Sequence, residues 1–412
     1  MSQPVVNITE LNGALGVSPS GDKLHAAIGV GGTSPVLAVD TPASFARTSD
    51  IVTALGGGPL CEYGCWYVET YHKPILLVRT GQTTAGTPGT LVISGVAGTS
   101  VVTLAVTAPN DDYEFLFKVI AGGTIGVAGI TYQYSLDGGR TLSATTALGT
   151  ANTFAFPGSG GVTLNFAAGT LIAGDNVTSR GTAPNWNTSE LTSALTALGN
   201  TSTQWREVNI VGVIDANAFD AIELRMSALS TAGKPKMWLG NGRVPAIAES
   251  EATYLAAMNT IFSSKASDYG ALCFGAQKMT SAVSGRKYKR PASWATASRQ
   301  GSVSEEINIA DVNLGPLVGT SIRDSNGNAD EHDETLNPGA DDAKFCALRT
   351  WDGFGGVFVN RPRLFCNPSS DFQLMPHRLV MNLAREAARL FLIKRLNKPV
   401  LVNTTTGKLL EE

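Results

Sequence analysis

The chain has 412 residues, of which 43% are hydrophobic and only 16% are charged, and its net charge at pH 7 is −3. Soluble globular proteins usually carry about 25% charged residues, so this chain is poor in charge. Its composition gives no sign of a nucleic-acid partner. No run of about 18 uncharged apolar residues predicts membrane insertion. The N-terminus lacks a basic segment followed by an apolar run, so we expect synthesis and assembly in the cytoplasm.

Residues 1–21 form a short segment of mixed polarity. Val5, Val6 and Ile8 predict a strand at a chain end, and a glycine-rich turn follows. A strand without a nearby hairpin partner can pair with the sheet of another subunit. We therefore expect an N-terminal strand-exchange arm, with a disordered tail as the alternative.

Residues 22–84 combine helix and strand signals. A helix is expected over 42–55, because Pro42 suits a first turn and apolar residues follow at helical spacing. Strands are expected at Trp66–Tyr71 and Pro74–Val78. The second is continuously apolar, as in a sheet that is covered on both faces.

Residues 85–182 differ sharply from the rest, with only eight charged residues and many Gly, Thr, Val and Ala. Short strand-like runs alternate with turn signals such as Asp137-Gly138. This pattern predicts a small β-sandwich inserted into the α/β part of the chain. The expected strands are Thr90–Ile93, Val101–Leu104, Tyr113–Phe117, Ile130–Tyr134 and Val162–Phe166.

The chain returns to alternating strands and helices after residue 182, at the spacing of βαβ units. The expected strands are Val208–Ile214, Pro235–Leu239 and Gly270–Phe274, and the expected helices are 216–229, 249–264 and 376–396. The predicted fold class is an α/β (α+β) core with an inserted all-β domain and two extended arms. The predicted boundaries are 1–21 for the N-terminal arm, 22–84 and 183–398 for the core, 85–182 for the insertion and 399–412 for the C-terminal arm.

Motifs for catalysis, cofactors and metals are absent at convincing spacing. Gly29–Ser34 lacks the lysine and the glycine spacing of a phosphate loop. Asp324–Asp330 faintly resembles a calcium loop, but Ala329 stands where glycine is needed. We interpret 324–342 and the basic run Gly285–Arg290 as surface loops, the second with a possible acidic partner. We expect no enzyme activity, no cofactor and no metal site.

The chain has five cysteines. Their spacing does not match a zinc site, and buried thiols are the plainer interpretation. An odd number also leaves open a bond between subunits in an oxidising medium. The candidates for a disulfide are Cys61, Cys65, Cys273, Cys346 and Cys366.

The segment after residue 375 carries the clearest signal for a partner. Leu379, Leu383, Ala387 and Leu390 fall on one stripe of the expected helix. A second stripe is basic, and a basic face in an acidic chain predicts docking onto an anionic surface. The basic stripe consists of Arg378, Arg385 and Arg389, and Lys394 and Arg395 follow near the end of the helix. The tail beyond Pro399 is strand-like and mirrors the N-terminus; its strand residues are Val400, Leu401 and Val402.

The run Arg349–Arg361, the helix 376–396 and the tail through Leu410 resemble the C-terminal part of contractile phage tail sheath proteins. Tyr134–Thr141 resembles a β-domain turn of related phage sheath insertions. The resemblance covers the domain order over most of the chain, and it rests on no catalytic signature.

The resemblance implies a structural subunit of a virion that forms hexameric rings stacked into a helical homopolymer around a tail tube protein. Baseplate and tail terminator proteins are the implied further partners. Both terminal arms would add strands to neighbouring subunits, the basic helix would attach to the tube, and the insertion would face outward. Contraction would drive the tube through the host envelope for genome ejection, without nucleotide hydrolysis.

Three alternatives stay open at this stage. A tube or baseplate protein is the first, although tube proteins are much shorter and dominated by β-structure. An enzyme such as a hydrolase with a carbohydrate-binding β-domain is the second, and it lacks paired catalytic carboxylates. A surface-binding module carried by 85–182 is the third, and that role is compatible with a sheath.

Overall fold

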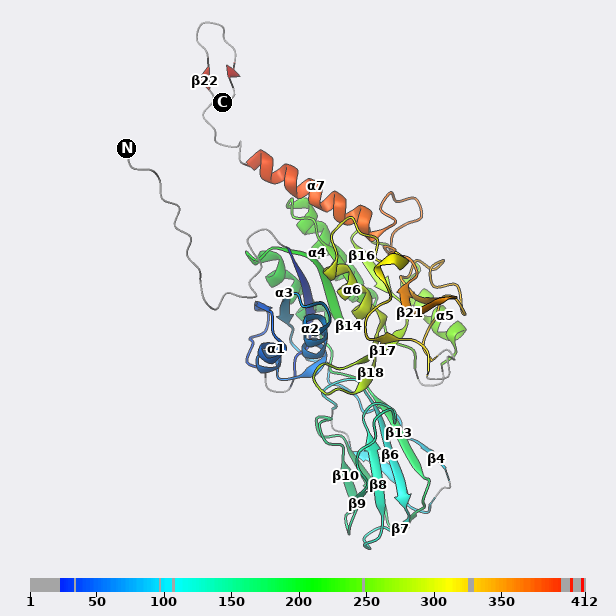
Figure 1. Ribbon diagram of the computed structural model, residues 1–412. Helices are drawn as coiled ribbons and strands as arrows, with labels where there is room; N and C mark the ends of the chain where they lie inside the picture. Colours follow the sequence, from blue (N-terminus) through cyan, green and yellow to red (C-terminus); the bar gives the residue numbers. More distant parts are fainter. Residues whose placement is uncertain are drawn as a thin grey trace, which may run out of the picture.

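A six-stranded sheet forms the middle of the larger part of the molecule (Figure 1). The computed structural model describes residues 23–32, 35–95, 98–105, 108–246, 249–324, 330–393, 401–402 and 409–410. The strand order is β16-β15-β14-β1-β3-β2, and all pairs are parallel except β2 with β3. The strands are β1 Leu24–Gly29, β2 Pro42–Phe45, β3 Ile75–Arg79, β14 Trp205–Val213, β15 Met237–Asn241 and β16 Gly270–Cys273.

Helices cover both faces of this sheet, because its central strands bury side chains on both sides. Ala27 of β1 contributes to one apolar core, and its neighbours Ala26 and Ile28 contribute to the other. Helices α1, α2 and α6 pack on the first face, and α3, α4 and α5 pack on the second. Their bounds are α1 Thr48–Leu55, α2 Gly58–Tyr71, α3 Thr188–Asn200, α4 Ala216–Thr231, α5 Glu251–Phe262 and α6 Ala292–Ser302. The expected mixed α/β class is confirmed.

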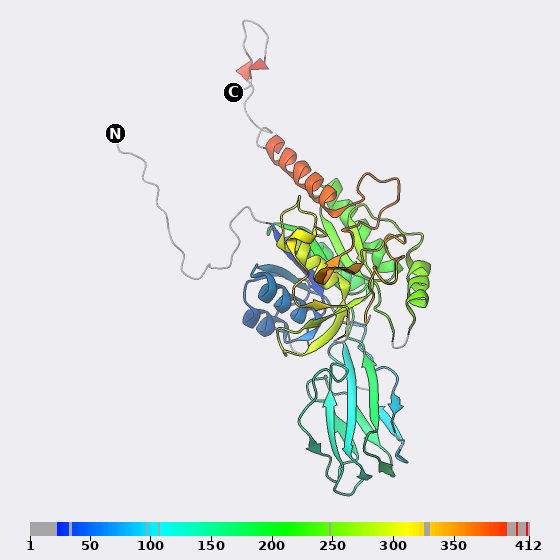
Figure 2. The same cartoon turned by 45° about the vertical axis from the view of Figure 1, so that its right-hand side comes forward.

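A separate β-rich part lies at one end of the molecule in both views (Figures 1 and 2). Its sheets are β4-β13-β6-β8-β9, β10-β11-β5 and β12-β7. Aromatic side chains, among them Phe117 and Phe154 with ring centroids 5.1 Å apart, fill its core. The strands are β4 Val92–Ser94, β5 Val102–Ala105, β6 Tyr113–Ala121, β7 Gly123–Thr124, β8 Thr131–Ser135, β9 Thr146–Ala147, β10 Thr153–Ala155, β11 Thr163–Phe166, β12 Thr170–Leu171 and β13 Asn176–Gly181.

Smaller elements complete the described chain. A three-stranded sheet has the order β18-β17-β19, and β20 pairs with β21 in an antiparallel hairpin. This hairpin contains most of the run Arg349–Arg361. The bounds are β17 Ala276–Thr280, β18 Lys287–Pro291, the 3-10 helix Val312–Leu314, β19 Thr320–Ser321, β20 Leu348–Trp351, β21 Phe354–Val359, β22 Leu401–Val402 and β23 Leu409–Leu410.

Arg290, near the end of β18, joins the two parts of the molecule. Its side chain is 1% exposed. Nε donates to Glu62 Oε2 of α2 at 2.6 Å, and Nη1 donates to the backbone oxygen of Asp112 at 2.8 Å. Nη2 pairs with Glu62 and with Asp111. Burial lowers the pKa of Arg290, but Asp111 and Glu62 outweigh it and raise the pKa, so the guanidinium stays charged.

Two predicted secondary structures are wrong. Trp66–Tyr71, predicted as a strand, is the second half of α2, which begins at Gly58-Pro59 with proline in its first turn. This helix is buried on all sides through Val68, so its sequence shows no alternation between apolar and polar faces. The predicted helix over 42–55 begins only at Thr48, because Pro42 opens the edge strand β2.

Both segments interpreted as surface loops are partly buried. The run Gly285–Arg290 leads into β18 and ends at the buried Arg290. In 324–342, the side chains of 331–334 are all buried. Each residue of 330–334 has a charged or backbone partner, so this segment links several elements, although Asp330 is itself exposed. Their partners are, in order, Lys278, Lys289, Glu251, Arg323 and the backbone N–H groups of 339–341.

His332 lies between two carboxylates. Its Nδ1 is 2.9 Å from Glu251 Oε2 on α5, and its Nε2 is 3.0 Å from Glu334 Oε2. Burial lowers the pKa of His332, but the hydrogen bonds to Glu251 and Glu334 outweigh it and raise the pKa above its ordinary value of 6.5. The ring therefore tends to carry a proton and to hold both carboxylates.

All five cysteines are free and buried. No disulfide joins them, and the predicted candidates therefore form no bond within the chain. Burial raises the pKa of the Cys366 thiol and so lowers its reactivity. A bond between subunits would first require one of these side chains to become exposed.

Candidate assembly surface

Helix α7, Met375–Ile393, lies at the opposite end of the molecule from the β-rich part (Figures 1 and 2). Its first turns rest on the α/β part through Met375 and Leu379, which are buried. Its later turns extend beyond the body (Figure 1). At a rise of 1.5 Å per residue the helix is about 28 Å long.

The side of α7 that faces the body carries polar residues beside Met375 and Leu379 and beyond them. Arg378 is 4% exposed, and its guanidinium carbon lies 4.0 Å from the ring centroid of Tyr269 and 4.5 Å from that of Phe372. Asn382, one turn later, is also buried. Burial lowers the pKa of Arg378, although Tyr269 opposes this shift.

Glu386 continues this polar side one turn further along the helix. Its carboxylate pairs with Lys236 Nζ at 2.8 Å and with Lys23 Nζ at 2.5 Å. Burial raises the pKa of Glu386, but the two ammonium groups outweigh it and hold the pKa below its ordinary value. Burial also lowers the pKa of Lys236, which the single carboxylate only partly offsets. Glu386, whose carboxylate is shared by two ammonium groups, is therefore ionised at neutral pH.

Two further arginines bind α7 to the end of α4. Arg385 donates from Nη1 to Ser230 Oγ at 2.9 Å and from Nη2 to the Ser230 backbone oxygen at 3.2 Å. Arg389 lies over Gly233, where its Cδ is 2.6 Å from the position of an added Cβ. Gly233 has a φ of 73°, so glycine suits this turn both for its backbone and for the space it leaves.

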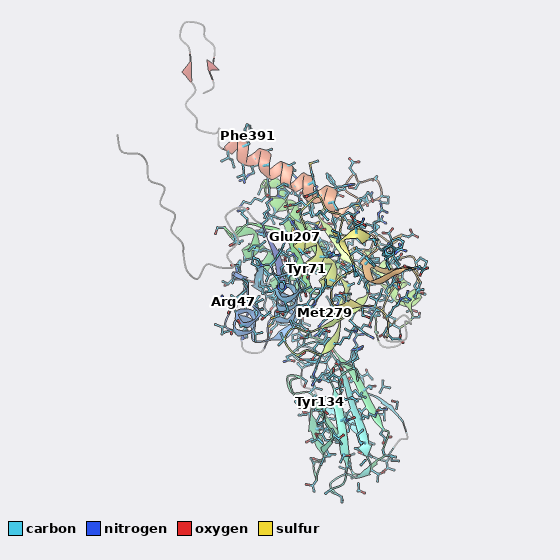
Figure 3. All side chains as sticks on the ribbon, in the orientation of Figure 1. Arg47, Tyr71, Tyr134, Glu207, Met279 and Phe391 are labelled. Carbon is cyan, nitrogen blue, oxygen red and sulfur yellow. The ribbon has the colours of Figure 1, made fainter. Side chains whose placement is uncertain are left out.

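Large apolar side chains are exposed along α7 from Val380 to Ile393, on its outward side and on both flanks. The outward side carries no charged residue, because the charged side chains from Arg378 to Arg389 lie on the side of the body. Phe391 marks its far end in Figure 3. The exposed large side chains are Val380, Met381, Leu383, Leu390, Phe391, Leu392 and Ile393, and Ala384, Ala387 and Ala388 lie between them. We call this exposed set the outward face of α7; Leu383 and Leu390 lie on one flank of it and Leu392 on the other.

A surface helix usually packs its apolar stripe on the core; here Leu379 does so, but Leu383 and Leu390 of the same stripe are exposed. The basic stripe was predicted to bind an anionic surface. Arg378 is buried within the chain and is removed from that surface. Arg385 and Arg389 contact α4, and Lys394 and Arg395 lie outside the described residues, so their contact with a tube stays a prediction.

The sequence displayed the apolar stripe but not the direction in which it points. The residues that settle the direction are Lys23 and Lys236, which are far from the helix in sequence and meet at Glu386. The one signal in the sequence was Glu386, a single acidic residue in an otherwise basic helix. The local pattern did not show that its partners are Lys23 and Lys236.

Most of the predicted strand-exchange residues lie outside the described residues. Val5, Val6, Ile8 and Val400 are outside the described residues. Leu401 and Val402 form β22, which pairs antiparallel with β23 of the same chain. Strand exchange between subunits stays a prediction.

Other kinds of site find no support in the described part of the chain. Its residues contain no group of three His, Cys, Asp or Glu side chains placed to hold a metal ion. No helix among them is long and apolar enough to cross a membrane. The feature with the clearest physical consequence is therefore the outward face of α7, which can associate by removing apolar area from water.

A family model described as DUF2586, N-terminal domain, matches residues 3–363. No curated protein matches the chain.

Three of the similar solved structures are sheath proteins. The sheath tail protein of Desulfitobacterium hafniense is 12% identical, with 95% of this chain and 83% of that chain covered and a TM-score of 0.46. The sheath tail protein of Listeria innocua is 12% identical, with coverage of 95% and 82% and a TM-score of 0.47. The sheath complex of the extracellular contractile injection system PVC, in its contracted state, is 11% identical, with coverage of 97% and 76% and a TM-score of 0.47.

Proposed function

The chain belongs to the DUF2586 family, and from its geometry we propose that it is the structural subunit of a contractile tail sheath. In this role it polymerises as stacked rings around a tail tube in a virion. It works by changing its packing and not by catalysis, and contraction of the polymer drives the tube through the host envelope.

The observation that carries the proposal is the outward face of α7. Seven large apolar side chains are exposed on one helix that extends beyond the body. Monomeric soluble proteins rarely expose contiguous apolar patches larger than a few hundred Å², and larger patches mark interaction sites. A subunit of a polymer explains this face, because a neighbouring molecule removes it from water.

The shape of the subunit supports the same role. The α7 end and the β-rich end point in opposite directions (Figures 1 and 2). Such a subunit can place α7 toward the axis of a ring and the β-rich part toward the outside. The resemblance of Arg349–Arg361 and the segment after it to phage sheath proteins supports the same arrangement.

Contraction then requires two packings of one polymer that differ in free energy. Apolar contacts are non-directional and depend mainly on area, so the outward face of α7 can slide or rotate against a partner at modest cost. Ion pairs within the subunit, such as those of Glu386, hold α7 to its own body during this movement. In this mechanism the subunits move largely as rigid bodies.

Electron microscopy of the purified full chain tests the proposal. We expect hollow tubular polymers, and we expect Leu390→Glu to abolish them, because a charge on the outward face would have to be buried without a partner. The matched control is Leu224→Glu on α4, which is exposed and should still form tubes. Single particles at every concentration of the unmodified chain, with or without a tube protein, would refute the sheath role.

A further inference from the structure

The outward face of α7 also poses a problem for the free subunit, which must stay in solution before it assembles. We propose that residues 4–17 of the same chain cover this face until assembly displaces them. This contact belongs to the free subunit, so it depends on the geometry of α7 and not on the identity of the polymer.

The first argument is the place where the N-terminal segment joins the body. Lys23, the first described residue, pairs with Glu386 in the middle of α7. Lys23 and Leu24 also line a cavity of about 460 Å³ together with Leu383, the first leucine of the outward face. The segment that precedes Lys23 is therefore attached beside the face that needs a cover.

The second argument is the match in character. Residues 4–17 contain Val5, Val6, Ile8, Leu11, Ala14, Leu15 and Val17 and only one charged residue, Glu10. The outward face is likewise apolar and carries no charge. An acidic partner would gain nothing there, because the basic side chains of α7 are turned toward the body.

The third argument is reach. Residues 18–22 can span up to about 17 Å when extended, at 3.3–3.6 Å per residue. The outward face from Leu383 to Ile393 is about 15 Å long, at 1.5 Å per residue. The segment 4–17 can therefore lie along the whole described length of this face, starting from Lys23.

A cysteine pair in the full chain tests the contact. Leu11→Cys with Ala387→Cys should form a bond within one chain under mild oxidation of a dilute sample, at a rate that does not depend on protein concentration. The five native thiols are buried, so they should compete little. The matched control is Leu11→Cys with Ser202→Cys, since Ser202 is exposed and lies close to the same attachment point, where Leu24 N donates to Gln204 O at 3.0 Å.

The bond to Ala387→Cys should form several-fold faster than the bond to Ser202→Cys, as read from non-reducing electrophoresis and from mass spectrometry of the joined peptides. Equal rates would overturn the proposal. Bonds that join two chains and rise with concentration would also overturn it, because a second copy would then be the cover.

Deletion of residues 2–17 gives an independent readout. The shortened chain should bind a hydrophobic fluorescent dye several-fold more strongly than the full chain. The further substitutions Leu383→Gln, Leu390→Gln and Leu392→Gln should return the signal to that of the full chain. A shortened chain without any rise in dye binding would refute the contact, whereas the formation of tubes, measured separately, decides the sheath role.

Discussion

Replacing Leu383, Leu390 and Leu392 by glutamine should raise the concentration at which the chain begins to polymerise. These side chains are 42%, 56% and 60% exposed in the subunit. Full burial of a leucine contributes about 1.5–3 kcal/mol, so covering what is exposed on all three contributes about 2–5 kcal/mol per subunit. Since 1.4 kcal/mol is a tenfold change, the threshold concentration should rise at least about 30-fold.

The threshold is measured by sedimenting the polymer at a series of protein concentrations and assaying the chain that stays in solution. The control is Leu224→Gln on α4, where a leucine is 76% exposed away from the outward face. Circular dichroism should show the same fold in all variants, because all three leucines are exposed in the subunit and none belongs to its core. A triple variant that polymerises at the original threshold would refute the role of this face.

Three further predictions concern the subunit itself and its C-terminal arm. Arg290→Met should lower the free energy of unfolding by about 3–5 kcal/mol, because it removes the cation that pairs with the buried Glu62 and contacts the buried Asp111; a loss below about 1 kcal/mol in denaturant titrations would contradict the junction between the two parts of the molecule. The pKa of His332 is raised in the folded chain, so the stability from its ion pairs is complete below about pH 6.5 and is lost as the pH rises through the raised value. The difference in free energy of unfolding between the original chain and His332→Gln should therefore shrink between pH 6 and pH 9. A difference that grows over this range in denaturant titrations would contradict a raised pKa of His332. Deletion of residues 399–412 should leave soluble monomer without tubes, and normal tubes from the shortened chain would defeat the strand-exchange prediction.

Continuous apolar runs made the central sheet predictable, and regular alternation did the same for the β-rich part. The runs at Val208–Ile214 and Gly270–Phe274 are apolar on both faces, and both are strands of the parallel sheet. The alternating run at Tyr113–Phe117 was equally clear, and it lies in β6 of the β-rich part. In each case the local pattern and the tertiary environment agree, so sequence reasoning sufficed.

Helix α2 shows where local patterns fail. Its aromatic residues favour a strand by propensity, and only burial on all sides makes a helix of them. The segment 330–334 failed for a related reason. Its charges predict a solvated loop, but each charge finds a partner on an element distant in sequence, and burial follows from those partners.

The orientation of α7 shows the same limit at the candidate site. The sequence displayed an apolar stripe and a basic stripe, and either of them could have faced the body. The choice is made by Lys23, Lys236 and Ser230, whose proximity to the helix only the tertiary fold reveals. The residues of one helix therefore indicated two stripes but not which partner each stripe contacts.

A cryo-electron microscopy reconstruction of the polymer, with side chains resolved on α7, tests the central claim most directly. The account predicts that Leu383, Leu390 and Leu392 of every subunit lie against another chain and that α7 is nearer to the axis than the β-rich part. A tubular polymer in which the outward face of α7 remains in contact with solvent would contradict it.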